Sequence, residues 1–316
     1  MADRNVFWDL VNSITHDHIQ PTVVDQIFTD NPMYATLEAN HRVILRGGDS
    51  ITWPVMYDKL NFGTYRGMTA FPSAEKQISK RAVLEWKQAF VDIVVSNYDA
   101  MRARGPLAVM DLLDELRQAA VLAAADGMGT EYYSDGAGNA GLQMDGFKLA
   151  VDDGTTYDSY GGFSRATNSW WKGNVNSTGG ALTIAAMNTS YGTATIGNVH
   201  PNIVTTSQTL WNKIWERVQP AQRYEAGDER NRTARIGFDC IRFNGADVVH
   251  DAHSPSGDIN YINTDYIEMR VQDGRMFDWT GWKAPTNQDG QQGQLLFMGN
   301  FIHQSPRMFA RDTGVT

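Results

Sequence analysis

The stretch that most constrains the fold is residues 106–126, PLAVMDLLDELRQAAVLAAAD. Pro106 suits the first turn of a helix, and Gly127 suits a left-handed stop. With a rise of about 1.5 Å per residue, such a helix is roughly 30 Å long, which predicts a strut for other elements. Its apolar side chains recur at steps of three and four, on one stripe: Val109, Leu112, Leu113, Leu116, Ala119, Ala120 and Ala123.

Composition limits the class of protein. The chain has 316 residues, enough for one large or two ordinary domains, and its 42% apolar content is typical of a soluble globular protein. It shows no secretory signal and no apolar run long enough for a membrane helix. Cys240 is the single cysteine, which excludes an internal disulfide and a cysteine-built zinc site and favours synthesis in a reducing cytoplasm. A net charge of −9 argues against a protein whose main task is binding nucleic acid.

Residues 1–48 are predicted to form an arm, with apolar residues that include Phe7 and Trp8. These residues are too few to make a core of their own, so the arm must dock on another surface. The arm is acidic on balance, which distinguishes it from a basic nucleic-acid tail.

A long hairpin is predicted after the arm. Apolar and polar side chains alternate over residues 51–57, and the chain returns along 82–95 after a polar, turn-rich middle at 58–80. Pro54 cannot donate a ladder hydrogen bond, so the first strand is expected to lie at an edge or to be loosely paired. We expect a protruding hairpin with little core beneath it, whose aromatic residues are covered by a partner: Trp53, Tyr57 and Trp86.

Residues 142–272 are predicted to form a separate α+β unit. Two helices are expected, at 181–191 and 210–218. Asn244-Gly245 predicts a hairpin turn. The expected strands are 201–206, 237–243, 246–250, 259–262 and 266–271. Two further strands, 293–302 and 306–311, are expected to return alongside the strut, which makes one domain discontinuous.

No catalytic, cofactor-binding or metal site is predicted. The sequence holds no GxSxG, P-loop or HExxH pattern. Residues 136–141 match GxGxxG, but they follow a helix instead of a strand, so we expect a glycine-rich turn. His250 and His253 are interpreted as surface histidines of a turn instead of metal ligands, and Cys240 as a buried inert thiol.

The order of these segments and several local phrases resembles a major capsid protein of tailed double-stranded DNA bacteriophages, with the Hong Kong 97-type shell fold. The resemblance covers nearly the whole chain. The phrases are YGGFSR at 160–165, WWKGN at 170–174, 198–206 followed by Leu210-Trp211, FNGA at 243–246, YINTD at 261–265, and the closing 300–316.

The resemblance implies an α+β fold with four parts: an N-terminal arm (1–48), an extended loop (49–94), a peripheral domain around the spine helix (95–141 and 273–316) and an axial domain (142–272). Candidate inter-subunit contacts are Phe7, Trp8, Trp53, Tyr57 and Trp86. Many relatives carry a cleaved N-terminal scaffolding extension, whereas here the arm begins at once. Scaffolding is then expected to be a separate protein, or the chain to be a processed or extension-free form.

The implied function is structural and not enzymatic. Hexamers and pentamers would tile an icosahedral virion capsid around double-stranded DNA, assembled in the host bacterial cytoplasm. Expected partners are further copies of the chain, a portal, and scaffolding or decoration proteins, with only weak contact to DNA and none to membrane. Two alternatives stay open: a cellular nanocompartment shell of the same fold, and a hydrolase with an unrecognised site in residues 142–272, which a deep pocket with converging titratable groups would reveal.

Overall fold

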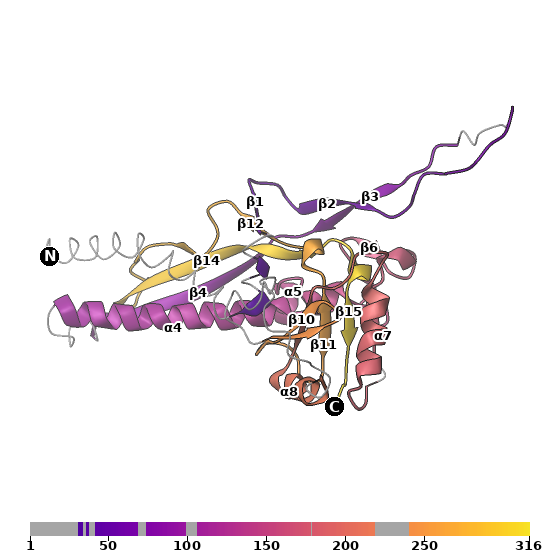
Figure 1. Cartoon of the computed structure of the whole chain (residues 1–316). Helices are drawn as coiled ribbons and strands as arrows, with labels where there is room; N and C mark the ends of the chain where they lie inside the picture. Colours follow the sequence, from indigo (N-terminus) through magenta and orange to yellow (C-terminus); the bar gives the residue numbers. More distant parts are fainter. Residues whose placement is uncertain are drawn as a thin grey trace.

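The computed structural model describes residues 31–33, 36–37, 42–68, 74–98, 106–177, 179–218 and 240–316. A long helix, α4 (Pro106–Tyr132), runs beside a first sheet, and a second sheet with two covering helices lies at the other end of the molecule (Figure 1). A two-stranded hairpin projects away from both sheets. No helix within the described ranges is both long and apolar enough to cross a membrane.

Helix α4 extends beyond its predicted end. It passes through Gly127 and Gly129 and stops at Tyr132, so the predicted stop at Gly127 is wrong. A glycine inside a helix costs about 1 kcal/mol relative to alanine, whereas burying a large side chain contributes about 1.5–3 kcal/mol. Met128 and Tyr132 are both buried in the last turns, and their packing outweighs the cost of the glycines.

The first sheet contains the long strands that lie beside α4. β4 (Lys87–Ser96) and β14 (Gly290–His303) are antiparallel from Gly290↔Ser96 to Gly299↔Lys87. The predicted return of a C-terminal strand to the strut is confirmed for β14, which reaches α4 through β4. The other strands are β1 (Arg42–Leu45), β12 (Ile267–Gln272) and β13 (Asp278–Trp279), with β12 between β1 and β14.

The second sheet has the strand order β7-β15-β11-β8-β10-β9. Helices α7 (Ile184–Ala194) and α8 (Gln208–Val218) cover one face, and their buried side chains form a separate apolar cluster with the sheet. The predicted turn is confirmed, because Asn244 and Gly245 have φ of 50° and 87° between antiparallel β9 and β10. The bounds are β7 (Asn174–Asn176), β8 (Ile203–Thr206), β9 (Cys240–Phe243), β10 (Ala246–His250), β11 (Ile259–Ile262) and β15 (Ala310–Asp312).

Three predicted strand placements differ from the structure. Strand β12, expected in the 142–272 unit, belongs to the first sheet, whereas β15, expected beside the strut, pairs with β11 and β7 in the second. The hairpin consists of β2 (Ile51–Met56) and β3 (Ser79–Leu84) alone, because β4 turns away to pair with β14. Alternation identifies a strand but not the strand with which it pairs.

Short elements connect the two sheets. Residues 136–141 form a turn in which Asn139 and Ala140 are left-handed (φ 48° and 56°), so the predicted glycine-rich turn is confirmed. The four-residue helix assigned within it, α5 (Gly138–Gly141), is too short and irregular to hold a phosphate at its N-terminus. The remaining short elements are α6 (Phe147–Ala150), β5 (Ser159–Tyr160), β6 (Phe163–Ser164) and three 3₁₀ helices, η1 (Ser169–Trp171), η4 (Thr264–Tyr266) and η5 (Pro306–Met308).

Candidate assembly surface

The base of the hairpin, which we call the loop root (residues 51–57 and 78–84), is part of the subunit's own core. The Trp53 side chain is 3% exposed, and its ring lies 6.3 Å from that of Tyr160. Alternate residues Ile51 and Val55 are buried on the same face of β2. The prediction that no core lies beneath the hairpin is therefore wrong for the root.

The predicted contact residues fall into three groups. The prediction that Trp53 contacts a second subunit is wrong, because its side chain is buried within its own subunit. Tyr57 and Trp86 are half-buried: Tyr57 stacks on Trp170 at 5.0 Å, and Trp86 Nε1 donates to the Gly48 carbonyl at 2.8 Å. Their contact role stays a prediction. Phe7 and Trp8 lie outside the described residues.

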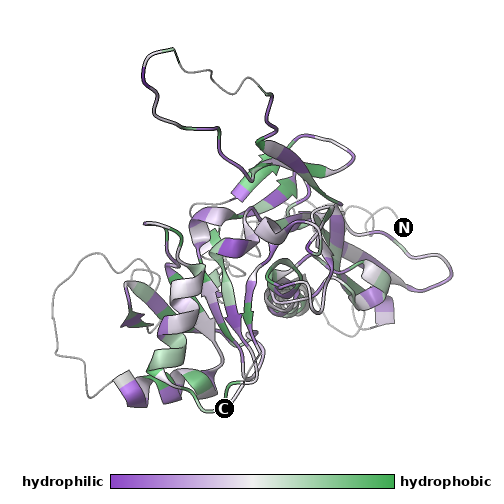
Figure 2. Cartoon of the chain, turned by 90° about the vertical axis from the view of Figure 1, so that its right-hand side faces the viewer, coloured by the Kyte–Doolittle hydropathy of each residue, from purple (hydrophilic) through white to green (hydrophobic). Residues whose placement is uncertain are grey.

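The distal part of the hairpin, the loop tip (residues 58–68 and 74–77), carries apolar side chains that the sequence analysis did not single out. Phe62 is 95% exposed, and three more large side chains of the tip are also exposed: Leu60, Tyr65 and Met68. Figure 2 shows this loop clear of both sheets. The sequence signal that could have identified these residues is their position in a polar, turn-rich stretch, where apolar side chains have no local core to bury them.

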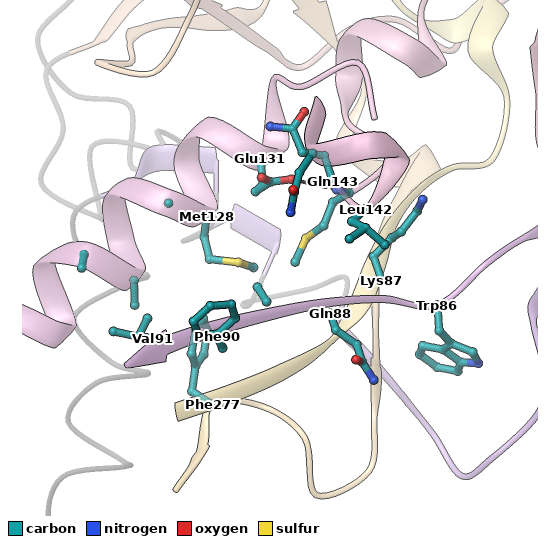
Figure 3. Close-up of a pocket in the computed structure, with 16 residues that line it drawn as sticks. Trp86, Lys87, Gln88, Phe90, Val91, Met128, Glu131, Leu142, Gln143 and Phe277 are labelled. Atoms are coloured by element: carbon teal, nitrogen blue, oxygen red, sulfur yellow. Dashed lines mark hydrogen bonds between the residues drawn. The ribbon is translucent and has the colours of Figure 1, made fainter. Parts of the chain in front are cut away.

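A groove of about 560 Å³ lies between α4 and β4 (Figure 3). Its lining is mostly apolar, and it includes Phe90, Val91, Ala124, Met128, Leu142 and Phe277. Two charged residues line it as well. Lys87 Nζ donates to the Gly141 carbonyl at 2.5 Å, and Glu131 Oε2 accepts from the Met144 backbone N–H at 2.7 Å. Both charges hold backbone in place, so the groove is an apolar surface and not an arrangement of reactive groups.

The two histidines do not form a metal centre. His250 packs beside Trp211, with ring centroids 6.2 Å apart, and in the described part of the chain no three His, Cys, Asp or Glu side chains gather as a metal site. His253 is not a free surface histidine, which corrects its interpretation. Its Nε2 lies 3.1 Å from Asp126 Oδ1 on α4, and its Nδ1 lies 3.4 Å from Asp251 Oδ1, a charge contact rather than an aligned hydrogen bond. Asp251, and then Asp126, raise the pKa of His253.

Two buried charged side chains, Asp312 on β15 and Arg165 after β6, are hydrogen-bonded within the fold. Asp312 accepts from Ser190 Oγ at 2.5 Å and from Tyr261 OH at 3.0 Å, and burial raises its pKa. The Arg165 guanidinium donates to three carbonyls, those of Leu149, Ala150 and Tyr157, and burial lowers its pKa.

These charges do not line a common deep cavity. The hollow between α7 and the C-terminal strand holds about 70 Å³, too little for a typical substrate. A wider hollow, of about 390 Å³, is lined by Asp145, Tyr157 and Tyr160 of this unit together with Lys87 and Asp135. The Cys240 side chain is not among those that the structure describes, so its predicted burial stays a prediction.

Solved structures share this arrangement over most of the chain. The capsid asymmetric unit of Cyanophage A-1(L) superposes with a TM-score of 0.67 at 17% identity, covering 91% of this chain and 93% of that one. The capsid of the native GTA particle gives 0.60 at 11% identity, with 89% and 90% covered. The chain has a Hong Kong 97-type capsid fold.

The capsid fold is also found in a structure of a different kind. The holo-SrpI encapsulin complex from Synechococcus elongatus PCC 7942 gives a TM-score of 0.53 at 8% identity, covering 87% of this chain and 85% of that one. No family model and no curated protein matches the sequence. With identities of 8–17%, the likeness lies in the arrangement of elements and not in shared residues.

Proposed function

We propose that this chain is a structural major capsid protein, which self-assembles into hexamers and pentamers that form an icosahedral phage head around double-stranded DNA. The observation that carries the proposal is the loop tip. A ribbon rooted in its own subunit's core holds the side chain of Phe62 and its apolar neighbours in solvent. The exposed apolar surface does not stabilise a monomer, whereas contact with a second copy would remove it from water.

The proposed assignment of segments to the extended loop and the two domains follows the capsid fold. The extended loop is the ribbon β2–β3 with its tip, the peripheral domain is built on α4 and the first sheet, and the axial domain on the second sheet. The residues proposed to contact other copies are those of the loop tip together with the half-buried Tyr57 and Trp86. The groove between α4 and β4 adds apolar surface on the body.

Further partners belong to the same proposal. Besides further copies of the chain, the proposed partners are a portal and scaffolding or decoration proteins. The net charge of −9 supports only weak contact with the packaged DNA, since tight binding needs clustered cations on the protein. The protein is accordingly proposed to reside in the virion capsid, and no catalytic role is proposed.

The test is assembly of the purified chain. Sedimentation velocity and electron microscopy at micromolar concentration should show capsomers or closed shells. A stable monomer at high micromolar concentration that turns over a substrate would falsify the proposal. The contents of shells isolated from the native source separate the two shell functions, because DNA supports a phage head and a packaged enzyme supports a nanocompartment.

A further inference from the structure

The loop root is held from the side by a short aromatic segment, which we call the aromatic turn (residues 159–171). Trp53 packs against Tyr160 of this turn, and the Val83 backbone N–H of β3 donates to the Gly161 carbonyl at 3.0 Å. Gly161 has φ of 59°, and a Cβ there would lie 3.3 Å from the Ala82 Cβ. The ribbon and the turn therefore meet backbone to backbone, at a position where glycine is required.

A second contact lies farther along the ribbon. The Tyr57 ring stacks on Trp170, with centroids 5.0 Å apart and planes 20° apart, and Lys80 Nζ lies 5.2 Å from the Tyr57 centroid. The Tyr57 N–H donates to the Ile78 carbonyl at 3.1 Å, at the point where the paired strands give way to the tip. This stack thus holds the ribbon at the end from which the tip extends.

A third contact ties the root to the first sheet. Arg270 of β12 donates through Nη1 to the Thr52 carbonyl at 2.9 Å, and the same guanidinium is paired with Glu268 at 2.8 Å. The aromatic turn thus contacts the root at Val83 of β3 and at Tyr57, where the tip begins. The first sheet contacts the root at Thr52, near the start of β2.

The aromatic turn is itself rigidly connected to the body. Trp171 is buried, and its Nε1 donates to the Tyr160 carbonyl at 2.8 Å. The Tyr160 hydroxyl accepts from the His303 backbone N–H at 3.0 Å, at the end of β14. The aromatic turn, and with it the ribbon, is therefore hydrogen-bonded to β14, the long strand of the first sheet.

We propose that the stack of Tyr57 on Trp170 fixes the angle at which the extended loop leaves the subunit, and so sets the curvature and diameter of the assembled shell. This inference rests on the proposed function. An extended chain rises about 3.3 Å per residue, so the tip extends roughly 35 Å beyond the stack. At that length a rotation of about 10° moves the tip by roughly 6 Å, more than the 4.0–4.5 Å range of an apolar contact. Both residues are positioning residues, because they act through the tip.

The experiment compares Tyr57→Ala and Trp170→Ala with the matched variant Phe62→Ala. Both stacked rings are half-buried, so the subunits should stay folded, as circular dichroism and thermal melts check. The two stack variants should form shells with a broad distribution of diameters, or open sheets. Phe62→Ala should raise the concentration needed for assembly and leave the diameter unchanged, and Tyr57→Phe should retain the wild-type diameter.

A second measurement keeps the inference separate from the proposed function. In the free subunit, spin labels at Phe62→Cys and Leu122→Cys, with Cys240→Ser, report the distance from tip to strut. Tyr57→Ala should at least double the width of that distance distribution. If wild-type protein forms no shell, the proposed function fails, while this measurement still decides whether the stack fixes the angle of the loop. Unchanged distances, or stack variants with wild-type diameters, would overturn it.

Discussion

At the scale of single residues, His303 is an acid-sensitive point in the core. Its ring is fully buried among the rings of Tyr132, Phe147, Tyr160 and Phe309, and among the described residues neither ring nitrogen has a hydrogen-bond partner. Burial lowers the pKa of His303 from 6.5 to about 3. Below pH 6.5 the unfolded state therefore binds a proton that the folded state does not, and stability is lost as the pH falls toward 3.

The free energy of unfolding should accordingly fall, by up to about 1.4 kcal/mol per pH unit from this group, between pH 6.5 and 3. His303→Phe keeps an aromatic ring and removes the titration, so its stability should depend less on pH in that window. Urea unfolding at a series of pH values measures the difference between the two proteins. Parallel losses of stability would show that His303 is not responsible.

Gly127 and Gly129 lie in the part of α4 that extends beyond its predicted end, and alanine substitutions test what each glycine contributes there. Open space surrounds the position that a Cβ on Gly127 would take, whereas a Cβ on Gly129 would overlap the His253 ring. Gly127→Ala should stabilise the protein by about 0.5–1 kcal/mol through helix propensity. Gly129→Ala gains the same propensity but displaces His253 from Asp126 and Asp251, so its melting temperature should fall. Equal shifts for the two variants in thermal melts would contradict this contact.

At the scale of elements, the loop root and loop tip should respond oppositely to the same substitution. Trp53→Glu removes core packing worth about 3–5 kcal/mol and places a carboxylate in an apolar site, against a total stability of about 5–15 kcal/mol. It should lower stability or solubility severely. Phe62→Glu changes a solvent-exposed side chain, so the subunit should melt near the wild-type temperature and fail to close shells. Thermal melts and sedimentation compare the two, and a folded Trp53→Glu subunit would show that the root is not core.

The sequence predicted elements better than their partners. Periodicity located α4 and the ribbon strands, and the Asn-Gly dipeptide located the turn at Asn244-Gly245, because these features depend on neighbours in the chain. It misassigned Trp53, since alternation shows which face of a strand is apolar but not what covers it. Here Tyr160 and Gly161, more than a hundred residues away in the sequence, supply that cover. The pairings of β12 and β15 were missed for the same reason.

At the scale of the whole molecule, the subunit combines a body with its own core and a projecting loop with exposed apolar residues (Figure 1). The long helix and the projecting loop of this architecture were predictable from the sequence, because each has its own hydrophobic periodicity. The candidate contact surface was predicted less well, since it depends on which apolar side chains the rest of the chain leaves uncovered. Phe62 is exposed and Trp53 is buried, and the sequence pattern does not distinguish the two.

Assembly should therefore protect the loop tip from proteolysis. Residues 58–68 are mostly exposed and have no paired strand around them, so a protease of broad specificity should cut there first in the free subunit. In a shell, the tip should lie against a neighbouring copy, and cleavage should slow by at least tenfold. Phe62→Glu subunits, held at the same concentration under assembly conditions, are the matched control and should be cut at the free-subunit rate. Mass spectrometry of early fragments locates the cuts. Equal rates in shells and free subunits would mean that the tip is not part of the contact between copies.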